Sequence, residues 1–231
     1  MTPDDPNVQM VEGLVEHLIG LTNEFVLVGG CATGLLITEA MTTKVRPTID
    51  VDLITSLATR SEYEQIAHKL RERGFVEDAT SDVICRWKVG SFLIDIIPTE
   101  EKVFGFGNIW YKEAYETATE VILPSGVKIR LIASPYFVAT KLIAFHDRGN
   151  GDFGASHDIE DIITVLNGRR ELVAEVQASP DRLQKFLRDE IEAFLLDPSF
   201  IEAVSWHLLP DEMSQARLPD IFKRLRAVTQ L

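Results

Sequence analysis

The sequence predicts an α+β protein, with a mixed β-sheet flanked by helices in residues 1–132 and a helical domain in residues 133–231. Two observations carry this prediction. In the first part, short apolar runs typical of strands alternate with segments whose apolar residues recur at helical spacing. In the second part only the helical spacing recurs, with prolines between the segments. The change of pattern near residue 133 therefore marks the expected domain boundary.

Helices are assigned from apolar residues three or four positions apart, and strands from short apolar or alternating runs. Asn7 or Asp5 is expected to cap the first helix, Ser61 and Glu64 to form a capping box, and Ser156 to cap a later helix. The predicted helices are 6–21, 31–41, 61–73, 111–117, 134–147, 157–166, 171–178, 180–196, 198–208 and 218–229. The predicted strands are 25–28, 45–54, 83–89, 92–97, 121–124 and 127–131.

The composition is that of a folded protein with an acidic surface. Of the 231 residues, 45% are hydrophobic, which suffices for a sizeable core, and the formal net charge is -13. Such a charge disfavours non-specific binding to a phosphate backbone, which needs clustered Lys and Arg, although it is compatible with a local basic groove. The N-terminal segment lacks signal-peptide features, and no apolar run approaches the roughly 20 residues of a membrane span. We therefore expect a soluble cytoplasmic protein with no membrane partner.

Two glycines, Gly29 and Gly30, separate the predicted strand at 25–28 from the next helix. A strand, a glycine pair and a helix bring the N–H groups of a helix N-terminus close to whatever lies above the strand, which favours a phosphate. The spacing fits neither the dinucleotide-binding glycine pattern nor a P-loop. A tight turn with close helix–strand packing would explain the same glycines without any ligand.

The stretch V-R-P-T-I-D-V-D-L-I at 45–54 alternates polar and apolar side chains. Because successive side chains of a strand point to opposite faces, we expect the polar set on one face and the apolar set on the other. Adjacent carboxylates at Asp50 and Asp52 are unfavourable without a cation between them, and oxygen ligands suit Mg²⁺. The alternative is the solvated face of an edge strand. The polar set is Arg46, Thr48, Asp50 and Asp52, and the apolar set is Ile49, Val51 and Leu53.

Asp95 is the only polar residue of the apolar run F-L-I-D-I-I. Burying an unpaired carboxylate costs several kcal/mol, so this side chain needs a partner. One candidate is a salt bridge to Arg86 or Lys88 across a hairpin. The other is a cation shared with Asp50 and Asp52, and the apolar neighbours favour it because they indicate a central strand.

Three charged residues of the second part are candidates for the site, and each also has a purely structural interpretation. Lys141 and Arg148 lie on the helix predicted at 134–147 or at its end, as ordinary surface charge or as phosphate contacts. Asp158 lies in the first turn of the next helix, where the helix dipole favours an acid even without a ligand.

Taken in order, V-G-G-x-A, R-x-T-x-D-V-D-L and the lone Asp95 resemble the nucleotidyltransferase fold of the polymerase-beta-like superfamily. The S-P-x-x-x-x-x-K-L-x-A helix and the H-D-I-E-D-I segment look like those of minimal nucleotidyltransferases typified by the AbiEii and MenT toxins. The resemblance covers about residues 20–168. It implies a metal-dependent enzyme that moves a nucleoside monophosphate from an NTP to an acceptor hydroxyl and releases pyrophosphate.

The same resemblance implies roles for individual residues. Asp50 and Asp52 would ligate two Mg²⁺ ions, and Asp95 would ligate one of them and help activate the acceptor hydroxyl. Gly29 and Gly30 would hold the triphosphate. Four further residues would contact the nucleotide or lie near it: Arg46, Thr48, Lys141 and Asp158.

The sequence leaves the acceptor open. The toxin-like motifs favour a tRNA 3′ end or a protein and suggest a cognate antitoxin, whereas the acidic balance favours a protein or a small molecule such as an antibiotic. A non-catalytic NTP-binding regulator is the alternative to an enzyme, and three costly carboxylates argue against it.

Overall fold

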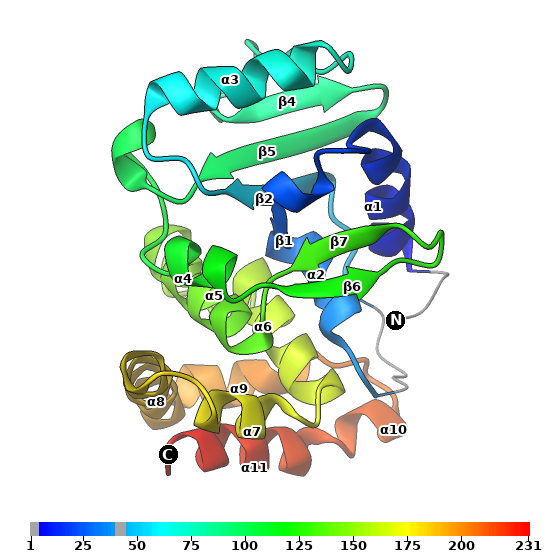
Figure 1. Ribbon diagram of the computed structural model, residues 1–231. Helices are drawn as coiled ribbons and strands as arrows, with labels where there is room; N and C mark the ends of the chain where they lie inside the picture. Colours follow the sequence, from blue (N-terminus) through cyan, green and yellow to red (C-terminus); the bar gives the residue numbers. More distant parts are fainter. Residues whose placement is uncertain (1–4, 40–44) are drawn as a thin grey trace. The chain divides into compact units, whose positions relative to one another are not determined.

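The computed structural model describes residues 5–39 and 45–231, which fall into two compact units (Figure 1). The first, which we call the sheet unit, comprises residues 5–34 and 47–133. The second, the helical unit, comprises residues 35–39, 45–46 and 134–231. A mixed sheet with helices in the first unit and helices alone in the C-terminal part confirm the predicted α+β class.

The sheet unit is built on seven strands in the order β3-β4-β5-β2-β1-β7-β6. The pairs β2–β5 and β1–β7 are parallel, and the other pairs are antiparallel. The strands are β1 Val26–Val28, β2 Asp50–Thr55, β3 Val76–Glu77, β4 Arg86–Val89, β5 Phe92–Pro98, β6 Thr119–Ile122 and β7 Lys128–Leu131. The helices that begin in this unit are α1 Pro6–His17, η1 Thr22–Glu24, α2 Gly29–Leu36, α3 Arg60–Arg71, η2 Glu101–Val103 and α4 Tyr111–Glu116.

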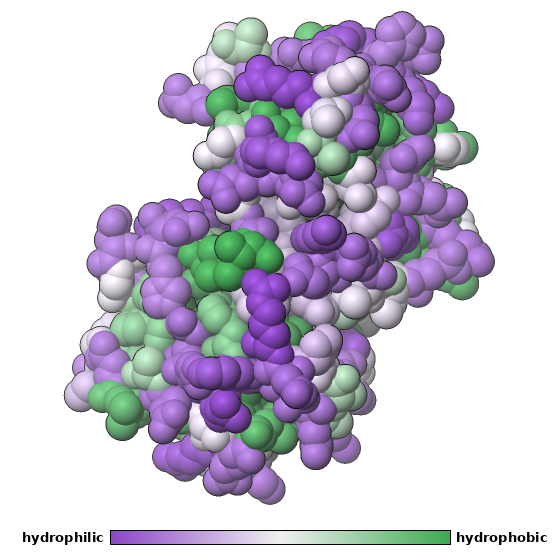
Figure 2. Space-filling view, turned by 60° about the vertical axis from the view of Figure 1, so that its left-hand side comes forward, coloured by the Kyte–Doolittle hydropathy of each residue, from purple (hydrophilic) through white to green (hydrophobic). Residues whose placement is uncertain are grey.

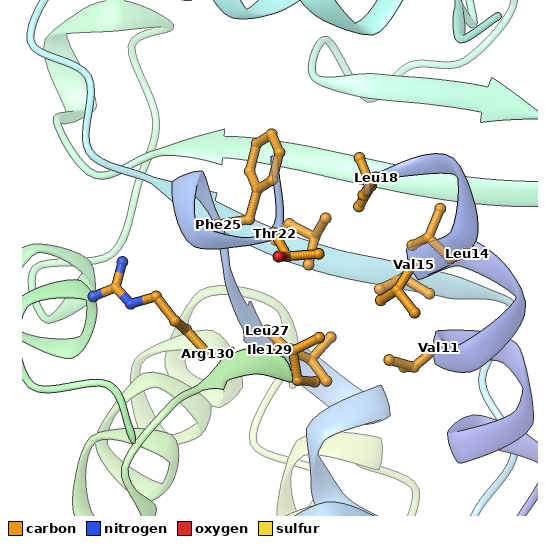
Figure 3. Close-up of a pocket in the computed structure, with 11 residues that line it drawn as sticks. Val11, Leu14, Val15, Leu18, Thr22, Phe25, Leu27, Ile129 and Arg130 are labelled. Atoms are coloured by element: carbon orange, nitrogen blue, oxygen red, sulfur yellow. The ribbon is translucent and has the colours of Figure 1, made fainter. Parts of the chain in front are cut away.

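Helices α1 and α3 cover one face of this sheet. Trp87 of β4 is buried and donates its indole N–H to the Tyr63 hydroxyl of α3 at 3.0 Å. Val51 and Leu53 of β2 face α1 across a cavity of about 20 Å³, which has room for about one water molecule. Figure 3 shows apolar side chains of α1 and of the sheet lining this cavity, with the Arg130 guanidinium directed away from it. By strand alternation, Asp50 and its even-numbered neighbours of β2 occupy the opposite face.

Strand β2 begins at Asp50, so the prediction of a strand from Val45 was wrong. Pro47 supplies no N–H to a ladder and restricts the backbone of the residue before it. The Thr48 N–H instead donates to the Asn7 side-chain oxygen at 2.9 Å. Ile49, expected in the core, is 77% exposed.

Helix α2 begins at Gly29, two residues before the predicted start, and ends at Leu36. The amides of Thr38 and Glu39 both donate to the Gly168 carbonyl at 3.0 Å, which ends the helical hydrogen-bond pattern. The predicted end at Met41 lies outside the described residues.

Capping agrees with the sequence at two helices and differs at a third. The Asp5 carboxylate caps α1 and the Ser156 hydroxyl caps α6, as predicted. Helix α3, however, carries its capping box at Thr59 and Glu62 rather than at Ser61 and Glu64. The box therefore lies two residues earlier, because the helix itself starts at Arg60.

The helical unit contains the predicted C-terminal helices and a short additional one, α10. Its core includes a cluster of stacked and edge-on rings from Phe145, Phe153, Phe194 and Phe200. On the face shown in Figure 2 hydrophilic side chains dominate, in keeping with a sequence that is 26% charged. Among the described residues, no helix is both long enough and apolar enough to span a membrane. The helices are α5 Ser134–Arg148, α6 His157–Gly168, α7 Leu172–Gln177, α8 Asp181–Leu196, α9 Pro198–Trp206, α10 Glu212–Gln215 and α11 Leu218–Val228.

Candidate active site

Three carboxylates lie on one face of the sheet, and we call Asp50, Asp52 and Asp95 the carboxylate cluster. Asp52 of β2 pairs in register with Asp95 of the parallel neighbour β5, and Asp50 precedes Asp52 by two residues on the same face. Strand β2 lies between β5 and β1, and β5 lies between β4 and β2. Both strands are therefore central, as predicted for Asp95, and the edge-strand interpretation of Asp50 and Asp52 does not hold.

The turn from β1 into α2 brings the helix N-terminus against the Asp52 carboxylate. Gly29 has a φ of +64°, which L-residues with side chains rarely adopt. A Cβ built on Gly29 would lie 1.8 Å from Asp52 Oδ2, so a glycine is required here for space as well as for conformation. The N-terminus of α2 carries the positive end of the helix dipole, which stabilises an anion at this position.

Hydrogen bonds from two elements fix the start of β2. The Thr48 hydroxyl lies 3.0 Å from the Asp50 carbonyl oxygen and 3.1 Å from Asp50 Oδ1. The Asn7 side chain of α1, fully buried, accepts the Thr48 N–H, and the Cys31 thiol of α2 lies 3.3 Å from the Asp50 carbonyl oxygen. Helices α1 and α2 thus both position the segment that carries Asp50.

A guanidinium lies within the carboxylate cluster. Arg86 Nε and Nη2 donate to the two oxygens of Asp95 at 2.8 Å each, and Nη2 also donates to Asp50 Oδ2 at 2.6 Å. The hydrogen bond to Asp95, aided by Asp50 and Asp52, raises the pKa of Arg86 above its ordinary value. Burial, with repulsion from Asp95 and Asp52, raises the pKa of the neighbouring Cys85 thiol to about 12, so this cysteine is a neutral thiol at pH 7.

The donor chemistry of the cluster fits a hard divalent cation, because all three ligands would be carboxylate oxygens. However, a positively charged side chain competes with a metal for these oxygens. Within residues 5–39 and 45–231, no group of three or more His, Cys, Asp or Glu side chains is arranged to hold a metal ion. Here the Arg86 guanidinium takes up oxygens of Asp50 and Asp95 that a metal would use.

Lys141 and Asp158, predicted near the nucleotide, lie together in the helical unit. Lys141 Nζ lies 3.1 Å from Asp158 Oδ1 and 2.6 Å from Asp161 Oδ2, joining α5 to α6. Arg148 also donates to Asp158, from Nη2 to Oδ1 at 2.8 Å and from Nε to Oδ2 at 2.9 Å. Arg46 Nε lies 3.4 Å from Glu160 Oε2, and Arg46 Nη2 lies 3.5 Å from Asp161 Oδ2. We call these six residues the ion network: Arg46, Lys141, Arg148, Asp158, Glu160 and Asp161.

Electrostatics hold the two central members of the ion network in their charged forms. Burial alone would lower the pKa of Lys141, but Asp161 and Asp158 outweigh it and keep that pKa above the ordinary value. Burial alone would raise the pKa of Asp158, but Arg148 and Lys141 outweigh it and lower that pKa. The Lys141 ammonium is therefore kept charged by two carboxylates of its own unit, Asp158 and Asp161.

The predicted site residues thus separate into two groups. Asp50, Asp52, Asp95 and Thr48 come together with Gly29 in the sheet unit, where α2 begins with Gly29 and Gly30. Arg46, Lys141 and Asp158 come together in the helical unit. The expectation that Arg46 shares a strand face with Thr48 and the two aspartates was wrong, because β2 starts after Pro47.

Two residues of the sheet unit have larger roles in the structure than the sequence predicts. The sequence predicts Arg86 only as a candidate salt-bridge partner of Asp95, and in the structure it also contacts Asp50. The sequence predicts Asn7 only as a candidate helix cap, and in the structure its side chain accepts the Thr48 N–H. The signal for Arg86 was present in the sequence, because counting outward from the turn at Gly90-Ser91 places Arg86 opposite Asp95.

Comparison with known proteins gives likeness in structure only. No protein-family model matches the sequence, and no curated protein matches it. The antibiotic-resistance factor ANT(2'')-Ia aligns with a TM-score of 0.45 at 15% identity, over 81% of this chain and 94% of its own. A candidate nucleotidyltransferase from H. pylori aligns with a TM-score of 0.46 at 11% identity, over 100% and 96% of the two chains. JHP933 from Helicobacter pylori aligns with a TM-score of 0.48 at 10% identity, over 96% and 90%.

Proposed function

We propose that this protein is a nucleotidyltransferase that moves a nucleoside monophosphate from an NTP to an acceptor hydroxyl. The observation that carries the proposal is the pairing of Asp52 with Asp95 on adjacent parallel strands, with Asp50 on the same face and Gly29 at the start of α2 directly against Asp52. A carboxylate cluster beside a glycine-rich helix N-terminus provides ligands for a cation and a site for a phosphate.

In this proposal Asp50, Asp52 and Asp95 would hold two Mg²⁺ ions, which would supply charge stabilisation to the attacking and leaving oxygens of an in-line displacement. The backbone amides of Gly29 and Gly30 contact the triphosphate, and Asp95 accepts the proton of the acceptor hydroxyl. The hydroxyl oxygen bonds to the α-phosphorus, the bond from that phosphorus to the bridging oxygen breaks, and pyrophosphate leaves.

For the acceptor we propose a tRNA 3′ end or a protein hydroxyl, as in the toxin-like subgroup that the sequence resembles, with a cognate antitoxin as partner. An antibiotic or another small molecule is the alternative acceptor. The nucleotide contacts of Arg46, Thr48, Lys141 and Asp158 stay predictions, since three of these residues already belong to the ion network.

A second function, non-catalytic NTP binding, is favoured by one observation. Arg86 bridges Asp50 and Asp95 at the position where a catalytic metal would be expected between them. A regulator that binds nucleotide without turnover would need no metal there.

One experiment separates these functions. The purified protein is incubated with Mg²⁺ and each of four α-labelled NTPs, with total cell RNA and total protein as acceptors. Under our proposal label enters RNA or protein, Asp52→Asn abolishes the transfer, and Asp82→Asn, which neutralises an exposed carboxylate elsewhere, preserves it. Metal-dependent NTP binding without transfer would favour a small-molecule acceptor or the regulator, and equal transfer by Asp52→Asn would refute the site.

A further inference from the structure

The position of Arg86 follows from the register of the β4–β5 hairpin. Arg86 pairs with Asp95 across the two strands, so both side chains lie on the same face. Its side chain is only 16% exposed, and its fork of N–H groups is matched by both oxygens of Asp95 and by one of Asp50. Such a bidentate, partly buried pairing is stronger than a surface ion pair.

The contacts of Arg86 compete directly with metal ligation. A carboxylate oxygen that accepts a hydrogen bond from a guanidinium offers less of its lone-pair density and charge to a cation. Arg86 also brings one positive charge to three carboxylates that would otherwise repel one another. It therefore stabilises the cluster without metal and raises the cost of binding one.

We propose that Arg86 is an internal counter-ion that a divalent metal must displace from Asp50 and Asp95, so that the bare ion binds weakly and the metal–nucleotide complex binds strongly. This inference rests on the proposed function and specifies how the same site selects its ligand. A triphosphate can take up the displaced guanidinium, because Arg matches phosphate oxygens in the same bidentate way as carboxylates. Each ligand then favours the arrangement that the other requires, which couples the two binding events.

The anchoring of β4 does not depend on Arg86. Its neighbour Trp87 is 1% exposed and bonded to Tyr63 on the other face of the sheet. Lys88, on the same face as Arg86, pairs instead with Asp78 at 2.8 Å. Replacing Arg86 should therefore change the cluster more than the fold, and Lys88 provides a control with the same change in charge.

The test measures Mn²⁺ binding by isothermal titration calorimetry in the native protein, Arg86→Gln and Lys88→Gln. We expect Arg86→Gln to bind Mn²⁺ alone roughly tenfold more tightly or better, because a positive charge within contact distance of the ligands is gone. Lys88→Gln should bind as the native protein does. With Mg²⁺ and α,β-methylene nucleoside triphosphates, Arg86→Gln should lose affinity relative to the native protein, so that the metal and the nucleotide no longer reinforce each other.

The outcomes separate a failure of this inference from a failure of the proposed function on which it rests. Equal Mn²⁺ affinity in the native protein and Arg86→Gln would overturn the counter-ion role and leave the metal site standing. No Mn²⁺ binding by any variant would overturn the metal site and the inference with it. If Arg86→Gln does not fold, the native protein provides the test by NMR spectroscopy. In the labelled native protein, the Arg86 Nε–Hε resonance should then shift when Mg²⁺ and the analogue bind, and an unchanged resonance would contradict the proposal.

Discussion

The carboxylate cluster and the ion network use the same kinds of side chain in opposite ways. The cluster sets three carboxylates against one guanidinium, on a sheet face where the Asp50 side chain is 24% exposed. The ion network sets three cations against three carboxylates, and Lys141, Asp158 and Asp161 within it are at most 7% exposed. The cluster has an excess of negative charge, which favours a cationic ligand, whereas the charges of the ion network balance and its buried members join two helices. Charged residues at predicted positions therefore do not by themselves mark a site.

The largest expected effect on stability comes from breaking the ion network. Lys141→Met leaves the buried carboxylates of Asp158 and Asp161 with less compensation, which should lower the free energy of unfolding by roughly 3–5 kcal/mol. Lys185→Met, which removes an exposed partner of Asp189, should change the free energy of unfolding very little. Urea unfolding of both variants checks this, and similar small losses would show that the network is not structural.

The largest expected effect on activity comes from crowding the cluster. Gly29→Ala adds a Cβ that would overlap the Asp52 carboxylate and so displace it, which should lower turnover by about 100-fold or more. Gly126→Ala introduces a similar positive-φ strain at a turn with nothing within 4 Å of the new Cβ. Transfer assays on both variants separate the two causes, and equal activities would argue against a working Asp52.

A smaller effect is expected from the hydrogen bond that precedes β2. Asn7→Ala removes the acceptor for the Thr48 N–H at a fully buried position and should cost about 1–3 kcal/mol of unfolding free energy. Turnover should also fall, since the segment that carries Asp50 loses a restraint. Gln9→Ala, on an exposed position of the same helix, is the control in chemical denaturation and in the transfer assay. A matching loss in both variants would assign the effect to the helix rather than to the hydrogen bond.

The smallest effect concerns pH. Arg148 and Lys141 keep the folded-state pKa of Asp158 below the ordinary 3.8, despite burial. Its stabilising contribution is therefore present above the unfolded pKa and is lost as pH falls from there through the lowered folded value. The difference in unfolding free energy between the native protein and Asp158→Asn should shrink over that range. A difference that stays constant down to the lowest pH would mean that Asp158 is not held ionised by its partners.

Much of the fold follows from local patterns. The helical periodicity located the helices of the second part, because an amphipathic face must be buried wherever it packs. The sequence predicts the start of β2 too early, because the alternation of polar and apolar residues extends through Pro47, which cannot donate to a strand ladder. The extent of α2 depended on the Gly168 carbonyl, a contact made across more than a hundred residues that no local pattern encodes.

The candidate site was less predictable than the fold. The adjacency of Asp50 and Asp52 is a property of any strand. The apolar neighbours of Asp95 favour a site shared with these two residues, but the parallel pairing of β2 and β5 that brings the three together is seen only in the structure. Arg86 could have been found by counting from the hairpin turn. The burial of Lys141 between Asp158 and Asp161 could not, because it depends on how α5 packs on α6.

The most direct test of the contrast compares two matched neutral substitutions, Asp52→Asn and Asp161→Asn, in the Mg²⁺-dependent transfer of α-labelled nucleotide and in thermal unfolding. We predict that Asp52→Asn abolishes transfer and changes the unfolding temperature little, because the relieved repulsion within the cluster offsets the lost attraction to the α2 N-terminus. Asp161→Asn should lower the unfolding temperature, with transfer retained by the folded fraction. Transfer that survives in Asp52→Asn, or a loss of stability there that matches Asp161→Asn, would contradict the assignment of the carboxylate cluster as the active site.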